Sequence, residues 1–227
     1  MKRIFYIAAV ALLCSSCFHV NKNYNGGIFI KGSGPIVSKT FDFKDFDTID
    51  INGGADVTFT QAEDYNVTVR TQESVLDSLD YRMEGTKLIL EVKDRKSIQA
   101  DVFEISITAP ELNKVTVSGA SDLDIKGLRI DGDLEVQVNG AGDLDFDQIV
   151  CDNFSVQVNG AADAKLSSID IRKLLKIEVN GAGDVDITGS AQDVTLEVNG
   201  AGDIDATGLK VAGEVKQHKA GIASIKL

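Results

Sequence analysis

The sequence predicts an all-β protein: a right-handed β-helix-like solenoid with coils of about 20 residues, preceded by a less regular β region. Three observations predict this fold. A Val-Asn-Gly-Ala-Gly-Asp motif recurs in the second half of the 227-residue chain. Apolar and polar residues alternate on both sides of each motif. The 21 glycines recur at regular intervals, as expected for turns of a repeating structure rather than for a flexible linker.

The repeat has four full copies, a weaker copy before them and a degenerate copy after them. In residues 136–146, apolar side chains take every second position before and after the glycines, which is the pattern of two short strands joined by a tight turn. An array of hairpins would give the same local pattern. One recurrent corner favours stacked coils, in which identical side chains lie above one another. The corner positions are Ser118, Asn139, Asn159, Asn180, Asn199 and Ala220, spaced by 19 to 21 residues.

The corner asparagines are expected to form a ladder, because neighbouring coils lie about 4.8 Å apart. Their amides can then hydrogen-bond along the stack and to the backbone, which indicates a structural role rather than ligand binding. This predicted turn ladder consists of Asn139, Asn159, Asn180 and Asn199.

The aspartate that closes each turn forms a second predicted ladder. Carboxylates about 4.8 Å apart repel by roughly 0.9 kcal/mol per neighbouring pair in water. A hydrogen bond from a turn N–H to each carboxylate contributes about 1.5–3 kcal/mol and offsets this repulsion. A cation such as Ca²⁺ is therefore permitted but not required, and no other cofactor is indicated. The candidate cation ladder consists of Asp122, Asp143, Asp163, Asp184 and Asp203.

The N-terminus has the pattern of an export signal. Residues 1–3 are basic at two positions, and residues 4–13 form an apolar run too short to span a bilayer as a mature helix. Ser15-Ser16-Cys17 resembles the lipobox of bacterial lipoproteins, which predicts a signal peptide over 1–16 and a lipid on Cys17. Cys14 departs from the usual aliphatic residue, and an ordinary secretory signal is the alternative.

The segment after the predicted cleavage site is rich in asparagine and glycine, so residues 17–34 are predicted to be a tether. Phe18 is not the aspartate that commonly retains such lipoproteins in the inner membrane. By that resemblance the sequence predicts a cell-envelope protein anchored in the outer membrane through its lipid.

The net charge limits the binding partners that we expect, and the cysteine content limits the disulfide bonds. A net charge of −12 repels phosphate backbones, which excludes nucleic acid as an expected partner. Loss of Cys14 and acylation of Cys17 would leave Cys151 without a disulfide partner in its own chain. We therefore expect Cys151 to be a buried, non-catalytic cysteine.

The rest of the chain divides into residues 35–114, an irregular β region, and residues 115–227, the repeats. Residues 51–57 echo the later turn, so 35–227 are expected to form one continuous domain. Several motifs occur in a characteristic order: Gly34-Pro35, the segments 46–57, 85–90 and 105–112, and the repeated turns. Together they resemble the family described as putative auto-transporter adhesin, head GIN domain. The resemblance covers residues 34–227 and implies a β-helix-like fold and an envelope location, with no catalytic residues to transfer.

The sequence predicts a non-catalytic function. Acid–base catalysis needs paired groups of different pKa in a sheltered site, whereas these carboxylates are regular and interchangeable. His19 and His218 have no evident nucleophile nearby. We predict a binding module or adhesin that displays a solenoid face to a protein or glycan. The alternatives are a structural component that assembles through an exposed solenoid end and, less favoured, a polysaccharide-processing enzyme.

Overall fold

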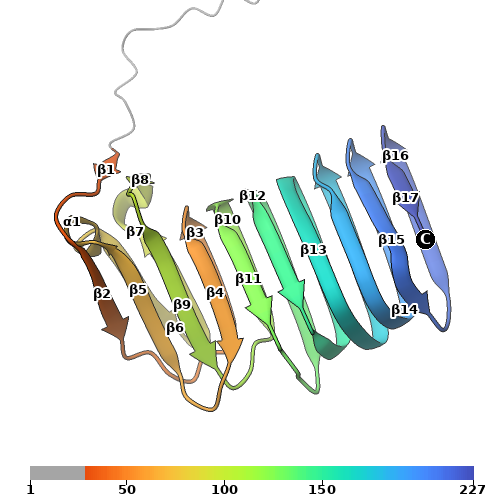
Figure 1. Ribbon diagram of the computed structural model, residues 1–227, viewed down its shortest axis with the longest axis horizontal. Helices are drawn as coiled ribbons and strands as arrows, with labels where there is room; N and C mark the ends of the chain where they lie inside the picture. Colours follow the sequence, from red (N-terminus) through yellow and green to blue (C-terminus); the bar gives the residue numbers. More distant parts are fainter. Residues whose placement is uncertain (1–28) are drawn as a thin grey trace, which may run out of the picture.

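A computed structural model describes residues 29–227 and confirms the all-β class (Figure 1). A single 15-stranded sheet dominates the protein and curls into a half-barrel. The predicted signal peptide and the predicted lipid-attachment residue Cys17 lie outside the described residues. In the described part, no helix has the length and apolar character needed to cross a bilayer.

The first part of the chain builds the less regular end of the sheet. Its helical elements are α1 (Glu73–Leu76) and a 3-10 turn, η1 (Lys93–Arg95). Its strands are β1 (Ile30–Lys31), β2 (Ile36–Phe41), β3 (Thr48–Gly53), β4 (Asp56–Gln61), β5 (Asn66–Gln72), β6 (Leu79–Glu84), β7 (Lys87–Val92), β8 (Ile98–Gln99) and β9 (Phe103–Ala109).

The repeats form longer strands that bend at the glycine turns. They are β10 (Lys114–Ala120), β11 (Asp122–Lys126), β12 (Asp133–Asp147), β13 (Val150–Gly181), β14 (Val185–Gly200), β15 (Asp203–Val211), β16 (Val215–Gly221) and β17 (Ser224–Lys226).

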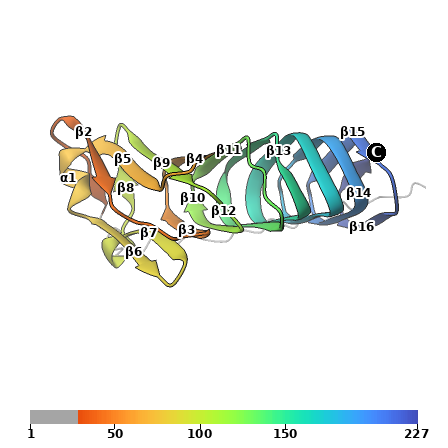
Figure 2. The ribbon, with the colours of Figure 1, turned by 90° about the horizontal axis from the view of Figure 1, so that it is seen from below.

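Successive copies of the repeat pair in parallel and in register. Val136 pairs with Val156 and Asn139 with Asn159, and β13 pairs with β14 in the same parallel sense, with two register shifts that change the offset from 21 to 19 residues. A hairpin array requires antiparallel pairs between neighbouring strands, so that alternative is wrong for the repeats. Figure 2 shows the consequence: β4, β11 and β15 lie along one face, and β3, β10 and β16 lie along the other.

The core lies between these two faces. Val136 and Val156 are fully buried, and so are the rings of Phe146 and Phe154, which meet edge to face with centroids 5.7 Å apart. Alternate residues of each strand are exposed, as the period-two pattern predicts. Each buried side chain of this size contributes about 1.5–3 kcal/mol, so stacking one copy on the next stabilises both.

The irregular N-terminal region belongs to the same sheet. Asn52 pairs with Ser118, and Asp56 pairs with Asp122, so the turn at residues 52–56 is stacked on the first repeat. Apart from β8, which pairs with β1, the strands of 35–114 therefore share one sheet with those of 115–227. Antiparallel strands finish this end: β5 lies beside β9, β2 beside β5, and β6 beside β7.

The range predicted as a tether is ordered at its C-terminal end. Ile30 and Lys31 form β1, which pairs in parallel with Ile98 and Gln99 of β8. This corrects the predicted boundary of the tether at residue 34. The sequence around β1 has no repeat pattern that could have shown a partner 68 residues away.

Candidate functional site

The structure brings the four predicted corner asparagines into one ladder. Nδ2 of Asn159 donates to Oδ1 of Asn139 at 3.0 Å, and the same bond links Asn180 to Asn159 and Asn199 to Asn180, each at 3.0 Å. Each internal amide therefore both donates and accepts along the stack. This arrangement supports a structural role, because the ladder ties each copy to the next.

The glycines beside the asparagines permit this close stacking. A Cβ atom on Gly140 would lie 1.9 Å from the carbonyl oxygen of Gly119, and one on Gly160 would lie 1.9 Å from that of Gly140. No side chain fits between backbones at that distance. The repeated glycine is thus a steric requirement of the stacked turn.

The predicted aspartate ladder is held by the backbone. The carboxylate of Asp122 accepts a hydrogen bond from the N–H of Asp143 at 2.9 Å, and that of Asp163 accepts one from Asp184 at 2.9 Å. Asp203 likewise donates its N–H to Asp184, at 3.0 Å. In the described region no such bond joins Asp143 to Asp163, where Ala162 replaces the glycine of the other turns.

These aspartates are exposed on the outer surface of the sheet. Among residues 29–227, no three His, Cys, Asp or Glu side chains converge in a way that could hold a metal ion. The geometry therefore gives the aspartates a defined role as acceptors of backbone N–H groups.

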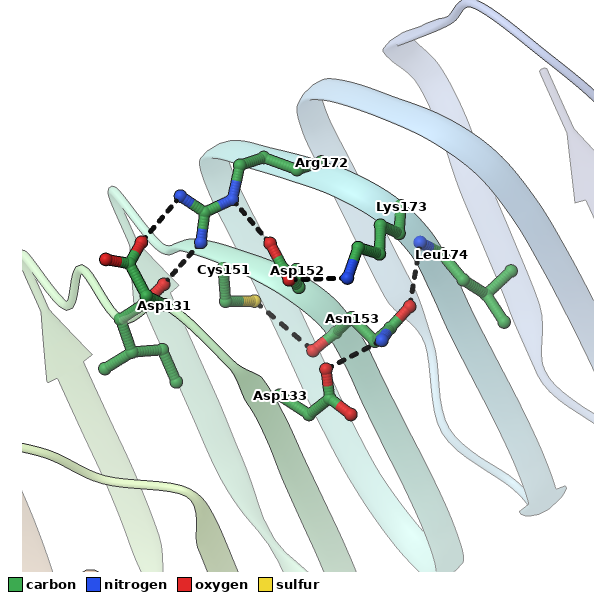
Figure 3. A network of polar contacts seen from close by, with 9 residues as sticks. Asp131, Asp133, Cys151, Asp152, Asn153, Arg172, Lys173 and Leu174 are labelled. Carbon is green, nitrogen blue, oxygen red and sulfur yellow. Dashed lines mark hydrogen bonds and ion pairs between the residues drawn. The ribbon is translucent and has the colours of Figure 1, made fainter.

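A second network ties successive copies together at the opposite corner (Figure 3). Arg172 donates from Nε to Asp152 at 2.7 Å, from Nη1 to Asp131 at 3.0 Å and from Nη2 to the carbonyl of Ile130 at 2.7 Å. Lys173 also pairs with Asp152, at 2.7 Å. The hydrogen bond from Lys173 is the main cause that lowers the pKa of Asp152. Asp152 therefore stays ionised at neutral pH, and the network links three consecutive copies.

Cys151 lies beside this network but is buried, as the sequence predicts. Its thiol donates to the carbonyl of Asn153 at 3.4 Å. Burial raises the pKa of the Cys151 thiol to about 12, so the nucleophilic thiolate is scarce at neutral pH.

The most developed concave surface lies elsewhere, at the junction of the irregular region and the first repeat. This junction cleft has a volume of about 620 Å³, compared with about 440 Å³ for the open groove along the aspartate ladder. The glycine turns at residues 52–54 and 118–120 form one side of the cleft. Residues 91–92 and 95–98 complete it.

The wall at residues 93–98 is strained and braced. Asp94 and Arg95 have φ angles of 56° and 52°, in the left-handed region that non-glycine residues rarely adopt. Such strain costs about 1–3 kcal/mol per residue and persists only where surrounding contacts impose it. Lys93 supplies two of these contacts, from its N–H to the carbonyl of Ser78 at 2.8 Å and from Nζ to that of Asp77 at 2.6 Å.

The other end of the same wall is fixed by β1. Ile30 donates its N–H to the carbonyl of Ser97 at 2.9 Å and pairs with Ile98. The wall is thereby held on both sides, which presets the shape of the cleft.

Arg95 carries the uncompensated charge of the junction cleft. Lys96 pairs with Asp94 at 2.8 Å, and this hydrogen bond lowers the pKa of Asp94. Glu91 pairs with Arg82 at 2.6 Å. Arg95 is exposed and forms no ion pair with any residue of 29–227. The cleft therefore presents one positive charge on a protein whose net charge is −12.

Sequence reasoning missed the junction cleft. Its walls come from three segments that the fold brings together, and the segment that carries its charged residues, 91–98, does not belong to the repeat. The one available signal was the basic run Lys93-Asp94-Arg95-Lys96 in an acidic chain.

Comparison with solved structures shows the same fold in other bacterial proteins. A putative adhesin from Bacteroides fragilis aligns over 87% of this chain and 99% of its own, with a TM-score of 0.66 and 20% identity. A putative lipid binding protein from Parabacteroides distasonis aligns over 87% and 98%, with a TM-score of 0.57 and 17% identity. A putative adhesin from the same species aligns over 87% and 99%, with a TM-score of 0.53 and 17% identity. No functionally curated protein matches the chain.

The sequence profile of one family, described as putative auto-transporter adhesin, head GIN domain, matches residues 45–227. That range contains the stacked turns, both ladders and all residues of the junction cleft. The chain belongs to the putative auto-transporter adhesin, head GIN domain family.

Proposed function

We propose that this protein is a non-catalytic binding module of the bacterial cell envelope, and that it binds its ligand in the junction cleft. The single observation that carries this proposal is the cleft itself: a concave surface of about 620 Å³ with a preset, strained wall. Binding sites for small ligands are typically concave, largely preformed and equipped with a few polar groups. Membership of an adhesin-like family supports the envelope location and the binding role.

The chemistry of the cleft supports binding rather than catalysis. Its carboxylate Glu91 is paired with Arg82, and Asp94 beside it is paired with Lys96. Acid–base catalysis needs a free proton donor and acceptor at a sheltered reacting centre. His218, the one histidine of residues 29–227, lies exposed on β16, whose partner is β14 rather than the strands of the cleft.

The stacked repeats act in this proposal as a right-handed β-solenoid that carries the cleft. The parallel in-register pairing of copies about 20 residues apart supports the solenoid. The right-handed sense follows the strong general preference of connections between parallel strands.

The anchor is the predicted lipid on Cys17, and the proposed location is the outer membrane. β1 is the first described strand and lies directly against the wall of the cleft, so a tether would join the protein beside its binding site. Metabolic labelling with a palmitate analogue tests the anchor: the full chain is expected to be labelled, and Cys17→Ser is expected to lose the label. Protease treatment of intact cells then separates a surface-exposed protein from a periplasmic one.

The binding role is tested with a cleft-blocking variant. Ser97 is exposed on the cleft wall, so Ser97→Trp fills the cleft without entering the core. Ser38 is exposed on β2, outside the cleft, and Ser38→Trp is the matched control. On an array of glycans and purified surface proteins, we expect the wild type and Ser38→Trp to bind the same ligands and Ser97→Trp to lose them. Retained binding by Ser97→Trp, with unfolding unchanged, would contradict the proposal.

Assembly within the envelope is the second candidate function. Every residue of β16 is exposed, and Ile222, which follows it, is 88% exposed. Against edge-to-edge pairing, Lys219 takes the position that Val198 holds in the previous copy, and a charge at such a position discourages strand addition. Crosslinking in cells distinguishes the candidates, since one constant envelope partner captured through β16 would favour assembly.

A further inference from the structure

We propose that Arg95 anchors the carboxylate of an acidic saccharide, of the uronic-acid class, in the junction cleft. This inference rests on the proposed binding function and specifies its ligand. The cleft combines one unpaired guanidinium with hydroxyl, backbone and aliphatic groups, and a carboxylated sugar carries matching groups.

The charge requirement comes from Arg95 and its surroundings. Lys96 and Glu91 are already paired, which leaves the Arg95 guanidinium as the free cation of the cleft. A guanidinium binds a carboxylate through two parallel N–H···O bonds, and such charge-assisted pairs are stronger than neutral hydrogen bonds. A ligand with a single carboxylate therefore matches the site.

The rest of the protein disfavours a highly charged ligand. A net charge of −12 repels polyanions at long range, and the aspartate ladder begins at Asp122, two residues beyond the cleft residue Ala120. The negative charge of the protein would repel a polyphosphate or a densely sulfated chain along its whole length. One carboxylate on an otherwise neutral body avoids that repulsion.

The body of the ligand would meet polar and apolar groups together. Ser97 and Ser118 offer hydroxyls, and the turns at residues 52–54 and 118–120 bring backbone groups to the cleft surface. Val92 and Ile98 add aliphatic surface for the C–H groups of a sugar ring. A volume of about 620 Å³ lies within the range of roughly 300–1,000 Å³ that is typical of small-ligand sites.

The braced wall lowers the entropic cost of binding a ligand in the cleft. Because Arg95 already has a left-handed backbone conformation, fixed by contacts of Lys93 and Ser97, ligand binding does not have to order this segment. Preorganisation of this kind reduces the entropy lost on binding.

The test is calorimetric titration of the full chain with an aldobiouronate (a disaccharide of one uronic acid and one neutral sugar), its methyl ester and a tripeptide with a free C-terminal carboxylate. We expect the aldobiouronate to bind the wild type, and the ester, which keeps the sugar body but lacks the charge, to bind at least about 10-fold more weakly. Arg95→Gln is expected to weaken aldobiouronate binding by about 10-fold to 100-fold and to leave the ester unaffected. Arg95→Lys should restore part of the affinity. Arg129 is an exposed arginine outside the cleft, so Arg129→Gln should bind like the wild type.

The outcomes separate this inference from the function on which it rests. Equal binding of acid and ester, or of wild type and Arg95→Gln, overturns the role of Arg95. Equal binding of the tripeptide, or no binding of the aldobiouronate, overturns the saccharide class. If Ser97→Trp abolishes binding to a ligand that is not an acidic saccharide, the cleft is the binding site but the inferred ligand class is wrong. If Ser97→Trp retains all binding, the cleft is not the binding site, and the proposed function is wrong.

Discussion

The carboxylate of Asp122 accepts a hydrogen bond from the backbone N–H of Asp143 across the stack, at 2.9 Å. The same relationship recurs between Asp163 and Asp184 and between Asp203 and Ser224, each at 2.9 Å. A charged acceptor on a backbone donor is a strong hydrogen bond, and it offsets the repulsion between stacked carboxylates. The aspartates thus stabilise the turn that they close.

Calcium is expected to leave the stability of the protein unchanged, because four of the five ladder carboxylates, all except that of Asp143, already accept a hydrogen bond from a backbone N–H. Calorimetric melts with millimolar CaCl₂ and with a chelator should give midpoints that agree within about 1 °C. A rise of several degrees with calcium would show that the ladder binds the ion and that the backbone bonds are not its main stabilisation.

Gly140→Ala is expected to destabilise the protein by about 1–3 kcal/mol or more, because the new methyl group would overlap the carbonyl oxygen of Gly119. Gly132→Ala is the matched control: its Cβ would meet nothing within 4 Å, and its φ is not in the left-handed region. The control should be neutral or more stable by about 0.4–1 kcal/mol. Denaturant unfolding measures both variants, and equal destabilisation would contradict the steric account of the turn.

The repeat was predictable because its physics is local and periodic. Alternation around residues 136–146 identified the buried side chains, and the recurrence of a corner residue every 19 to 21 residues, as from Asn139 to Asn159, identified which residues stack. The partner of β1 could not be predicted in this way. Its pairing with β8 joins two short segments that occur once each, and only the folded chain brings them together.

Glu178 should make stability depend on pH. Three side-chain hydrogen bonds lower the pKa of the Glu178 carboxyl below its ordinary value of 4.5. The bond from Asn180 has the largest effect, followed by those from Lys176 and Gln157. A lowered folded-state pKa gives stability that is present above the ordinary value and is lost as the pH falls through the folded-state value. Glu178→Gln should therefore be less stable than the wild type by roughly 1 kcal/mol near neutral pH, and the difference should shrink in acid.

Unfolding of the wild type and Glu178→Gln at about pH 7 and about pH 3 measures this effect. Glu197 occupies the paired position one copy later, so Glu197→Gln is the control, with no side-chain donor to its carboxylate in the described part of the chain. A difference for Glu178→Gln that does not change between the two pH values would exclude the carboxylate as its source.

Cys151 should react with thiol reagents only after the structure opens. Its thiol is buried, and its pKa of about 12 keeps it protonated at neutral pH. A Cys14→Ser, Cys17→Ser variant isolates this thiol. Modification by a disulfide reagent should be slow in buffer and fast in guanidinium, and comparable rates in the two conditions would contradict the buried assignment.

The functional site was less predictable than the fold. The regular spacing of the aspartates made their ladder predictable. Arg95 lies in a segment that is not repeated, so no periodicity marks it. It is left without an ion-pair partner in the described region because Asp94 pairs with Lys96 instead. Lys93 braces the backbone of this segment through a hydrogen bond from its N–H to the carbonyl of Ser78, which lies between α1 and β6. Neither relationship has a sequence pattern.

The central claim is that the repeated turn supports the protein and the junction cleft binds the ligand. The most direct measurement compares ligand binding, on the same array, by Ser97→Trp in the cleft and Asp163→Asn in the ladder. We expect Ser97→Trp to lose the ligands of the wild type and Asp163→Asn to retain them. Loss of binding in Asp163→Asn together with retention in Ser97→Trp would contradict it.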